Sequence, residues 1–292
     1  MTGSAIGGGD DPSRSDAGRV VTLPAVAQTA FWTAACRADE SARASARIHD
    51  PWAAVLAGEE GLSVGRALER EGRAHEAIVA RTCVVDEFVA AAAREVDAVY
   101  SFGAGLCTRR LRLGIELPWT EVDLPALVSW KDVAAAPLPG ADKVRRVGLD
   151  LRDTPAVSRL LSERVEPRLL VVLEGVLVYL EEKEVVALLT VLGARVGSTR
   201  VVLDLGGGLW ASLFARRTRA TVGAHGTPYR TSLRQGRKAL AKAGFEVLAD
   251  RSLVDWDAAT PAPRFYRPPS AWLVPGFADV ARVLEARAPR RP

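Results

Sequence analysis

A glycine turn between an apolar run and a potential helix constrains the fold of this chain most strongly. The run Val99–Phe102 leads into Gly103-Ala-Gly105, and the next apolar run ends on Asp123, eighteen residues after Gly105. A Rossmann-like unit brings an acid to a ribose diol at an offset of roughly 20 residues. Thr108 stands where a dinucleotide-binding turn has its third glycine. The pattern therefore predicts a nucleoside site that makes no close pyrophosphate contact.

Three further apolar runs also close on a carboxylate, at Asp150, Glu174 and Asp204. In an open α/β sheet the ligand lies outside the carboxyl ends of the strands, so these acids are expected to share one crevice. Strands are expected at 97–102, 119–123, 144–149, 168–174, 199–204 and 244–249, with helical segments between them. This alternation predicts a doubly wound, mostly parallel α/β sheet. The segment 281–287 fits either a short helix or a final strand.

Helices are expected before the sheet begins. Apolar spacing predicts helices over 25–47 and 77–94, and Asp50-Pro51 has the pattern of an N-cap followed by proline at the first helical position. We expect a disordered tail over 1–19 and one domain over 20–292. That domain would comprise a helical cap over 20–80 and a Rossmann-like core over 81–292, with an insertion near 206–232.

Composition narrows the function classes. The net charge is +4. The apolar runs are too short to span a bilayer, so we expect no membrane association and a cytoplasmic location. Basic residues concentrate between Arg216 and Lys238, which fits a solvated helix face or a dock for an anionic substrate or acidic carrier protein. No nucleic-acid-binding module accompanies them. The three cysteines have no metal-ligand spacing, so no metal site is expected.

Several motifs together resemble the leucine carboxyl methyltransferase family, in particular its bacterial branch of small-molecule O-methyltransferases. The resemblance runs from about residue 29 to about residue 245. It is carried by Ala38-Asp-Glu40, His49-Asp50-Pro51, Arg81-Thr-Cys-Val-Val-Asp86, the glycine turn with Thr108-Arg109, Glu121-Val-Asp-Leu-Pro125, Asp150-Leu-Arg-Asp153 and Glu174-Gly-Val-Leu-Val-Tyr-Leu180. It implies a seven-stranded Rossmann-like methyltransferase fold in which 281–287 is a strand.

The resemblance also implies S-adenosylmethionine as the cofactor and assigns its contacts. These would be Arg81, Gly103, Gly105, Asp123, Asp150, Leu151 and Glu174. Arg81 would bind the methionine carboxylate, Asp123 the ribose hydroxyls, Asp150 and Leu151 the adenine, and Glu174 the ammonium. The family usually has an aspartate just before Thr108-Arg109, where this chain has Cys107. A thiol is a weaker acceptor than a carboxylate, so cofactor affinity is in question.

The acceptor is less constrained by the sequence. A carboxylate is ionised at neutral pH, whereas a phenol with a pKa near ~10 must lose a proton. His225 is the histidine placed in a potential substrate loop, and Tyr179, Trp32 and Trp210 could line the acceptor pocket. We predict O-methylation of a carboxyl or phenolic oxygen on a small molecule of polyketide type, free or bound to a carrier protein.

Three alternatives stay open. They are methyl esterification of a protein C-terminal carboxylate, oxidoreduction with a nicotinamide cofactor, and nucleotide binding without catalysis. The oligomeric state cannot be inferred from the sequence.

Overall fold

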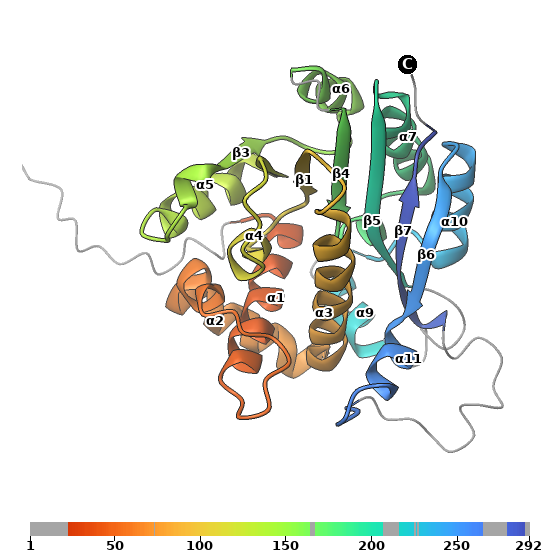
Figure 1. Cartoon of the computed structure of the whole chain (residues 1–292). Coiled ribbons are helices and arrows are strands. Elements are labelled where there is room, and N and C mark those ends of the chain that lie inside the picture. The colour runs from red at the N-terminus through yellow and green to blue at the C-terminus, as the bar shows by residue number, and fades with distance from the viewer. Residues whose placement is uncertain are drawn as a thin grey trace, which may run out of the picture.

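One mixed sheet organises the described part of the chain, which comprises residues 23–72, 74–163, 167–206, 216–224, 226, 228–264 and 279–289 of a computed structural model. Within these residues the sheet has seven strands in the order β3-β2-β1-β4-β5-β7-β6 (Figure 1). The strands are β1 (Ala98–Phe102), β2 (Trp119–Asp123), β3 (Val144–Gly148), β4 (Arg168–Leu173), β5 (Ser198–Gly206), β6 (Glu246–Ser252) and β7 (Ala281–Arg287). Strands β1 to β5 pair in parallel, and β7 pairs antiparallel with β5 and β6. The predicted sheet, including a strand at 281–287, is confirmed.

Helices cover both faces of the sheet because alternate strand residues point to opposite sides. On β4, Val171 and Leu173 pack with α6 (Thr154–Ser162), α7 (Glu182–Ala194) and α10 (Leu233–Lys242). Leu170 and Val172 pack on the other face with α3 (His75–Ala92) and α11 (Leu253–Ala258). Both faces of the central strands are therefore covered by apolar side chains, and polar groups concentrate where the strands end.

The remaining helices are the N-terminal pair and helices in the connections between strands. They are α1 (Ala25–Ser41), α2 (Trp52–Gly72), α4 (Arg109–Arg112), α5 (Pro125–Ala135) and α9 (Arg216–Ala224), with the 3₁₀ turns η1 (Ala141–Lys143) and η2 (Leu177–Tyr179). Helices α1 and α2 pack against each other to form the expected N-terminal helical cap (Figure 1). At the start of α2, Asp50 Oδ1 accepts from the Ala53 N–H at 3.1 Å, as the predicted N-cap requires.

Helix α1 ends at Ser41 instead of continuing to residue 47. Side chains at its end bind the backbone of the segment that follows. The Glu40 carboxylate accepts from the Arg47 N–H at 2.7 Å, and Ser41 Oγ accepts from the Asp50 N–H at 2.7 Å. These contacts favour a turn over further helix, and apolar spacing alone does not reveal them.

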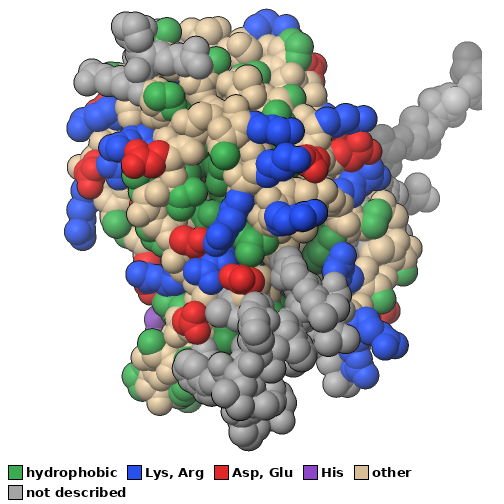
Figure 2. All heavy atoms as spheres, turned by 90° about the vertical axis from the view of Figure 1, so that its right-hand side faces the viewer, with side chains coloured by type: hydrophobic (Ala, Val, Ile, Leu, Met, Phe, Trp, Pro, Cys, Tyr) green, Lys and Arg blue, Asp and Glu red, His purple; other side chains and the backbone are tan. Residues whose placement is uncertain are grey.

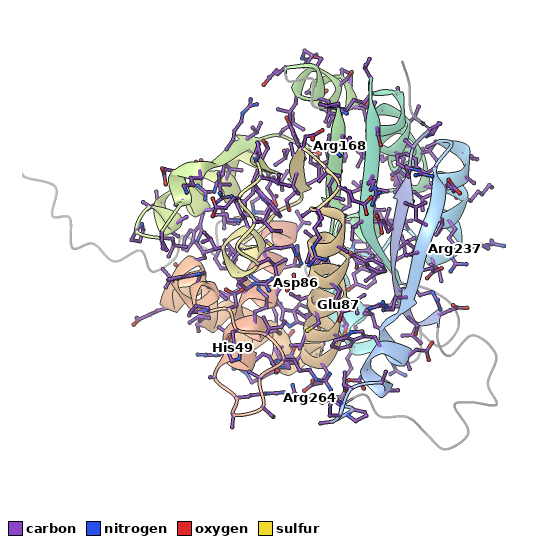
Figure 3. All side chains as sticks on the ribbon, in the orientation of Figure 1. His49, Asp86, Glu87, Arg168, Arg237 and Arg264 are labelled. Atoms are coloured by element: carbon purple, nitrogen blue, oxygen red, sulfur yellow. The ribbon has the colours of Figure 1, made fainter. Side chains whose placement is uncertain are left out.

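A cluster of ion pairs joins the cap to the segment after α11. Glu40 is fully buried, and its carboxylate accepts from Arg264 Nη1 at 2.7 and 2.8 Å. Arg47 Nη1 donates to Asp257 Oδ1 at 2.6 Å, and His75 Nε2 lies 3.3 Å from Glu40 Oε2. Figure 3 shows Arg264 at the end of the molecule where these segments meet. Among the described helices, none is long and apolar enough to cross a bilayer.

The close approach of α1 and α2 requires glycine at 65. A Cβ there would lie 2.3 Å from the Phe31 carbonyl oxygen and 2.7 Å from Ala35 Cβ. We predict that Gly65→Ala lowers the free energy of unfolding by about 1–3 kcal/mol through overpacking, as measured by urea denaturation. The control is Gly223→Ala in α9, where a Cβ meets nothing within 4 Å and stability should stay equal or rise. Equal stability of the two variants would contradict the tight α1–α2 contact.

Candidate functional site

A cavity of about 860 Å³ opens at the carboxyl ends of the strands, between the sheet and α1. Asp123, Asp150, Glu174 and Asp204, which end four predicted strands, all line it. The crevice expected from the strand pattern is therefore present, and the acids on both sides of the glycine turn converge in it.

The glycine turn after β1 forms the floor of the cavity. Gly103 has φ +63°, and a Cβ there would lie 2.3 Å from Val176 Cγ2. Gly105 has φ +48°, again in the region that favours glycine. Both positions therefore need glycine, and the bare backbone lets a ligand approach closely.

Asp123 is tied to this turn by its carboxylate. Oδ2 accepts from the Gly105 N–H at 2.6 Å, and Oδ1 accepts from the Leu124 N–H at 2.7 Å. Burial raises the pKa of Asp123 above its usual value, although these two N–H groups oppose the shift. Each carboxylate oxygen can accept a second hydrogen bond, which is what a ribose diol needs.

Asp150 and Leu151 lie at the far end of the same crevice, after β3. Asp150 is bound by Arg152, whose Nε lies 3.0 Å from both carboxylate oxygens and whose backbone N–H donates to Oδ1 at 2.9 Å. The hydrogen bond from the Arg152 side chain holds the pKa of Asp150 below its usual value. A donor group of a ligand would compete with the exposed Arg152 side chain for this carboxylate. Leu151 is buried and offers an apolar contact.

Glu174, which follows β4, is held between two arginines. Arg81 Nε from α3 donates to Oε1 at 3.1 Å, and Arg109 Nη2 from α4 donates to Oε2 at 2.6 Å. Although burial opposes ionisation, Arg109 and Arg81 hold the pKa of Glu174 far below its usual range. Glu174 is therefore an anion whose charge is already balanced.

Arg81 reaches a second acid, Asp204, at the end of β5. Its Nη1 lies 3.5 Å from Asp204 Oδ2, while Asp204 Oδ1 accepts from the Gly175 N–H at 2.5 Å. A Cβ at Gly175 would approach the Arg81 Nη1 and Nη2 atoms to 3.3 and 3.4 Å, so glycine makes room for the guanidinium. Burial raises the pKa of Asp204.

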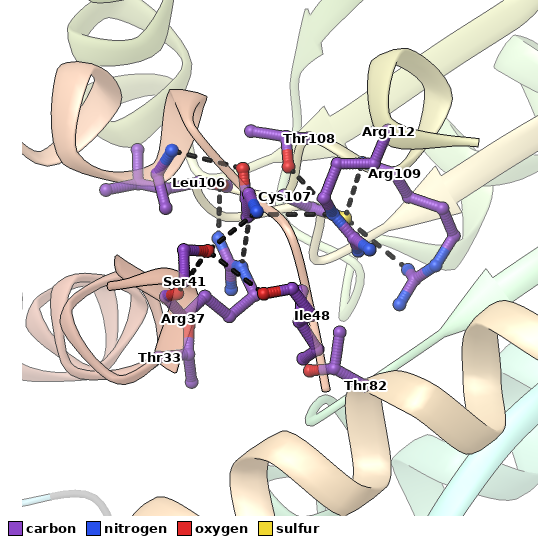
Figure 4. Close-up of polar contacts among 12 residues, drawn as sticks. Thr33, Arg37, Ser41, Ile48, Thr82, Leu106, Cys107, Thr108, Arg109 and Arg112 are labelled. Carbon is purple, nitrogen blue, oxygen red and sulfur yellow. Dashed lines mark hydrogen bonds and ion pairs between the residues drawn. The ribbon is translucent and has the colours of Figure 1, made fainter. Parts of the chain in front are cut away.

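Cys107 lies beside Arg109 at the edge of the cavity. Both the Arg109 N–H and Nη1 donate to its Sγ at 3.4 Å, so the thiol accepts contacts that would suit a carboxylate at this position. Arg37 Nε donates to Asp50 Oδ2 at 2.8 Å. Figure 4 shows Arg37 near Leu106, whose carbonyl accepts from Arg37 Nη2 at 2.7 Å. Arg37 thus joins the cap to the glycine turn. It also lines the cavity, a role not predicted from the sequence.

Aromatic side chains line the part of the cavity under the cap. Trp32 is buried with Nε1 donating to Glu69 Oε2 at 2.7 Å, and Tyr179 forms an edge-to-face pair with Tyr229 at 5.9 Å between ring centroids. All three aromatic residues border the cavity.

Tyr229 is a wall residue that the sequence did not reveal. The Arg230 N–H donates to the Val178 carbonyl at 2.7 Å, and Thr231 Oγ1 donates to the Leu180 carbonyl at 2.5 Å, which hold Tyr229 beside η2. Its only sequence signal is its place in the predicted insertion. The other candidates from that insertion, His225 and Trp210, lie outside the described residues.

The basic stretch from Arg216 to Lys238 is divided between two helices. On the face that carries α10, acidic side chains lie among the basic ones (Figure 2). Arg237 pairs with Asp250, Lys238 with Glu182 and Arg230 with Glu181, whereas Arg219 of α9 borders the cavity. The part on α10 therefore fits a solvated helix face.

Comparisons with known proteins agree with this geometry. The sequence model of leucine carboxyl methyltransferase matches residues 30–193, which is more than half of the chain. A Mycobacteroides abscessus protein provisionally named an S-adenosyl-L-methionine-dependent methyltransferase is 36% identical over 152 residues, which is 46% of this chain and 50% of that protein. The chain thus matches this curated relative over about half of the relative's length.

Solved structures share the fold at low identity. A DUF574 family protein from Streptomyces avermitilis has a TM-score of 0.58 at 15% identity, covering 82% of this chain and 95% of that chain. A Thermobifida fusca protein, provisionally named a methyltransferase, has a TM-score of 0.56 at 15% identity, covering 81% and 92%.

The contacts of Glu174 with Arg81 and Arg109 should contribute to the stability of the fold, and a substitution can measure that contribution. A carboxyl group whose pKa is lowered by folding stabilises the protein above its usual pKa, near ~4.3, and that contribution is lost as pH falls below it. We predict that Glu174→Gln lowers the free energy of unfolding at pH 7 by about 3 kcal/mol, because buried Arg109 loses one of its two carboxylate partners. The difference from wild type should shrink in acid. Glu163→Gln, at an exposed pair with Arg145, should change stability by less than about 0.5 kcal/mol, and an equal loss there would contradict the assignment.

Proposed function

Because the chain belongs to the leucine carboxyl methyltransferase family, we propose that it is an S-adenosylmethionine-dependent O-methyltransferase that acts on a small molecule. The observation that carries the proposal is the contact of Asp123 with Gly105 on the cavity floor. It sets a carboxylate with spare acceptor capacity beside a backbone that has no side chains to block a nucleoside.

The cavity residues fit the cofactor along its length. Asp150 and Leu151 would take the adenine, Asp123 the ribose diol, and Arg81 and Glu174 the amino-acid end. The bound cofactor supplies a methyl group made electrophilic by its sulfonium charge. The protein aligns the acceptor with that methyl group and excludes water, since displacement at carbon depends on alignment.

The size of the cavity supports a small acceptor. Ligand pockets span roughly 300–1,000 Å³, so about 860 Å³ leaves room for an acceptor beside the cofactor. Trp32, Tyr179 and Tyr229 favour a flat aromatic molecule such as a polyketide, free or carried by a protein. The acceptor atom would be a phenolic or carboxyl oxygen. Methylation of a protein C-terminus would need a docking surface as well, and the ion-paired face of α10 does not favour one.

Removal of the Asp123 carboxylate tests the cofactor site. We predict that the protein binds S-adenosylmethionine and S-adenosylhomocysteine in isothermal titration and that Asp123→Ala weakens both by about 100-fold or more. Hydrogen bonds to a charged group contribute about 1.5–3 kcal/mol each, and two would be lost. The control is Asp132→Ala, at an exposed pair with Arg146 outside the cavity, which should bind as wild type does. Absence of heat with wild-type protein would refute the proposal and favour a different ligand.

Cys107 gives an independent test of the same site. We predict that Cys107→Asp tightens S-adenosylmethionine binding by about 5- to 10-fold, because an added negative charge beside the cavity attracts the cationic cofactor. Cys107→Ser, which adds no charge, should leave the dissociation constant within about twofold. Unchanged or weaker binding by Cys107→Asp, measured in the same titration, would contradict this prediction, and unchanged binding would show that Arg109 neutralises the new charge.

A further inference from the structure

The sheet order puts one acid beyond the expected end of the cofactor. Along the edge β3-β2-β1-β4-β5, the strand ends carry Asp150, Asp123, the glycine turn, Glu174 and Asp204 in that order. If the adenosine lies at Asp150 and Asp123 and the amino-acid end at Glu174, the next position belongs to the acceptor. This step rests on the proposed function, and it leaves Asp204 facing the acceptor.

The four strand-end acids differ in the contacts that their carboxylate oxygens make. Both oxygens of Glu174 accept from guanidinium groups, both oxygens of Asp123 accept from backbone N–H groups, and Asp150 is chelated by Arg152. Asp204 differs from these three, because Oδ1 is fixed by the Gly175 N–H at 2.5 Å, whereas the cation nearest to Oδ2 among the described residues is Arg81, at a longer distance of 3.5 Å.

The surroundings of Asp204 suit a base. Its side chain is 11% exposed and borders the cavity. The charged and titratable groups that face it are Arg81 from α3, Glu174 after β4, Tyr179 from η2 and Tyr229 from the insertion. Burial raises the pKa of Asp204 above that of an ordinary aspartate, and the charge of Arg81 opposes that shift.

We propose that Asp204 is the general base for a phenolic acceptor, which defines the substrate as an aromatic hydroxyl compound and not a carboxylate. An oxygen lone pair of the acceptor forms the new bond to the methyl carbon. The carbon–sulfur bond breaks, and its electron pair stays on sulfur. The hydroxyl proton passes to Oδ2 of Asp204 and then leaves to water. A carboxylate acceptor would arrive already ionised and would be repelled by Asp204.

Binding of two matched probes tests the acceptor class. At pH 7, 2-naphthol is neutral and 2-naphthoate is ionised, and the two have the same ring system. With protein saturated by S-adenosylhomocysteine, we expect isothermal titration to give at least tenfold tighter binding of 2-naphthol. Asp204→Asn should reduce that preference to within about twofold, and Asp250→Asn on the edge strand β6 should preserve it. Preference for 2-naphthoate, an unchanged preference in Asp204→Asn, or binding of neither probe would overturn the proposal.

The rate of methyl transfer separates a base from a structural group. A general base contributes about 10²- to 10⁴-fold, so Asp204→Asn should slow formation of 2-methoxynaphthalene at least 100-fold at pH 7. The loss should shrink as the pH approaches the ionisation of 2-naphthol itself, whereas a structural defect would give the same loss at every pH. Absence of the ether from wild-type protein, or formation of methyl 2-naphthoate instead, would also overturn the proposal.

A binding control separates the two proposals. S-adenosylhomocysteine titration should give the wild-type dissociation constant for Asp250→Asn. Asp204→Asn should still bind S-adenosylhomocysteine and reach saturation, although its contact with Arg81 can change the affinity, and this binding shows that the variant is folded. Failure of the wild-type protein to bind S-adenosylhomocysteine would refute the methyltransferase proposal as a whole. Normal cofactor binding with the wrong probe preference refutes only the role of Asp204.

Discussion

The buried guanidinium of Arg109 is the contact on which the cavity depends. Only 1% exposed, it donates to Asp86 of α3 at 2.7 Å and to Glu174 after β4 at 2.6 Å, while its own residue begins α4. Figure 3 shows Asp86 on the side of α3 that faces α4. A buried cation needs anions with good geometry to offset its lost hydration, so these three elements can pack only in a narrow range of arrangements. The glycine turn that precedes α4 is fixed with them.

Around that contact the cavity alternates cations and anions. Arg81 bridges Glu174 and Asp204, and Arg109 bridges Glu174 and Asp86. A zwitterionic ligand can therefore replace existing ion-pair partners of these side chains. Without the ligand, the buried charges are not left unpaired. Such preorganisation lowers the reorganisation that accompanies binding.

The sequence predicts the backbone of this site better than its side-chain partners. Strand ends could be located because apolar runs close on Asp123, Asp150, Glu174 and Asp204, and a parallel sheet brings its carboxyl ends to one edge. The position of Tyr229 could not be predicted from the sequence. It depends on two hydrogen bonds from the neighbouring residues to the loop after β4, about fifty residues earlier in the chain. Periodicity shows which face of an element is buried but does not identify the partner of a charged group.

The ion pair between Glu40 and Arg264 has a consequence for how the chain is made. The two residues are 224 positions apart, and Glu40 is fully buried. During synthesis, the end of α1 carries a carboxylate whose principal cation has not yet been translated. Domains fold from the N-terminus as the chain emerges, and contacts of high sequence separation form late. The contact that ties the end of α1 to Arg264 can therefore form only after strands β1 to β6 have been translated.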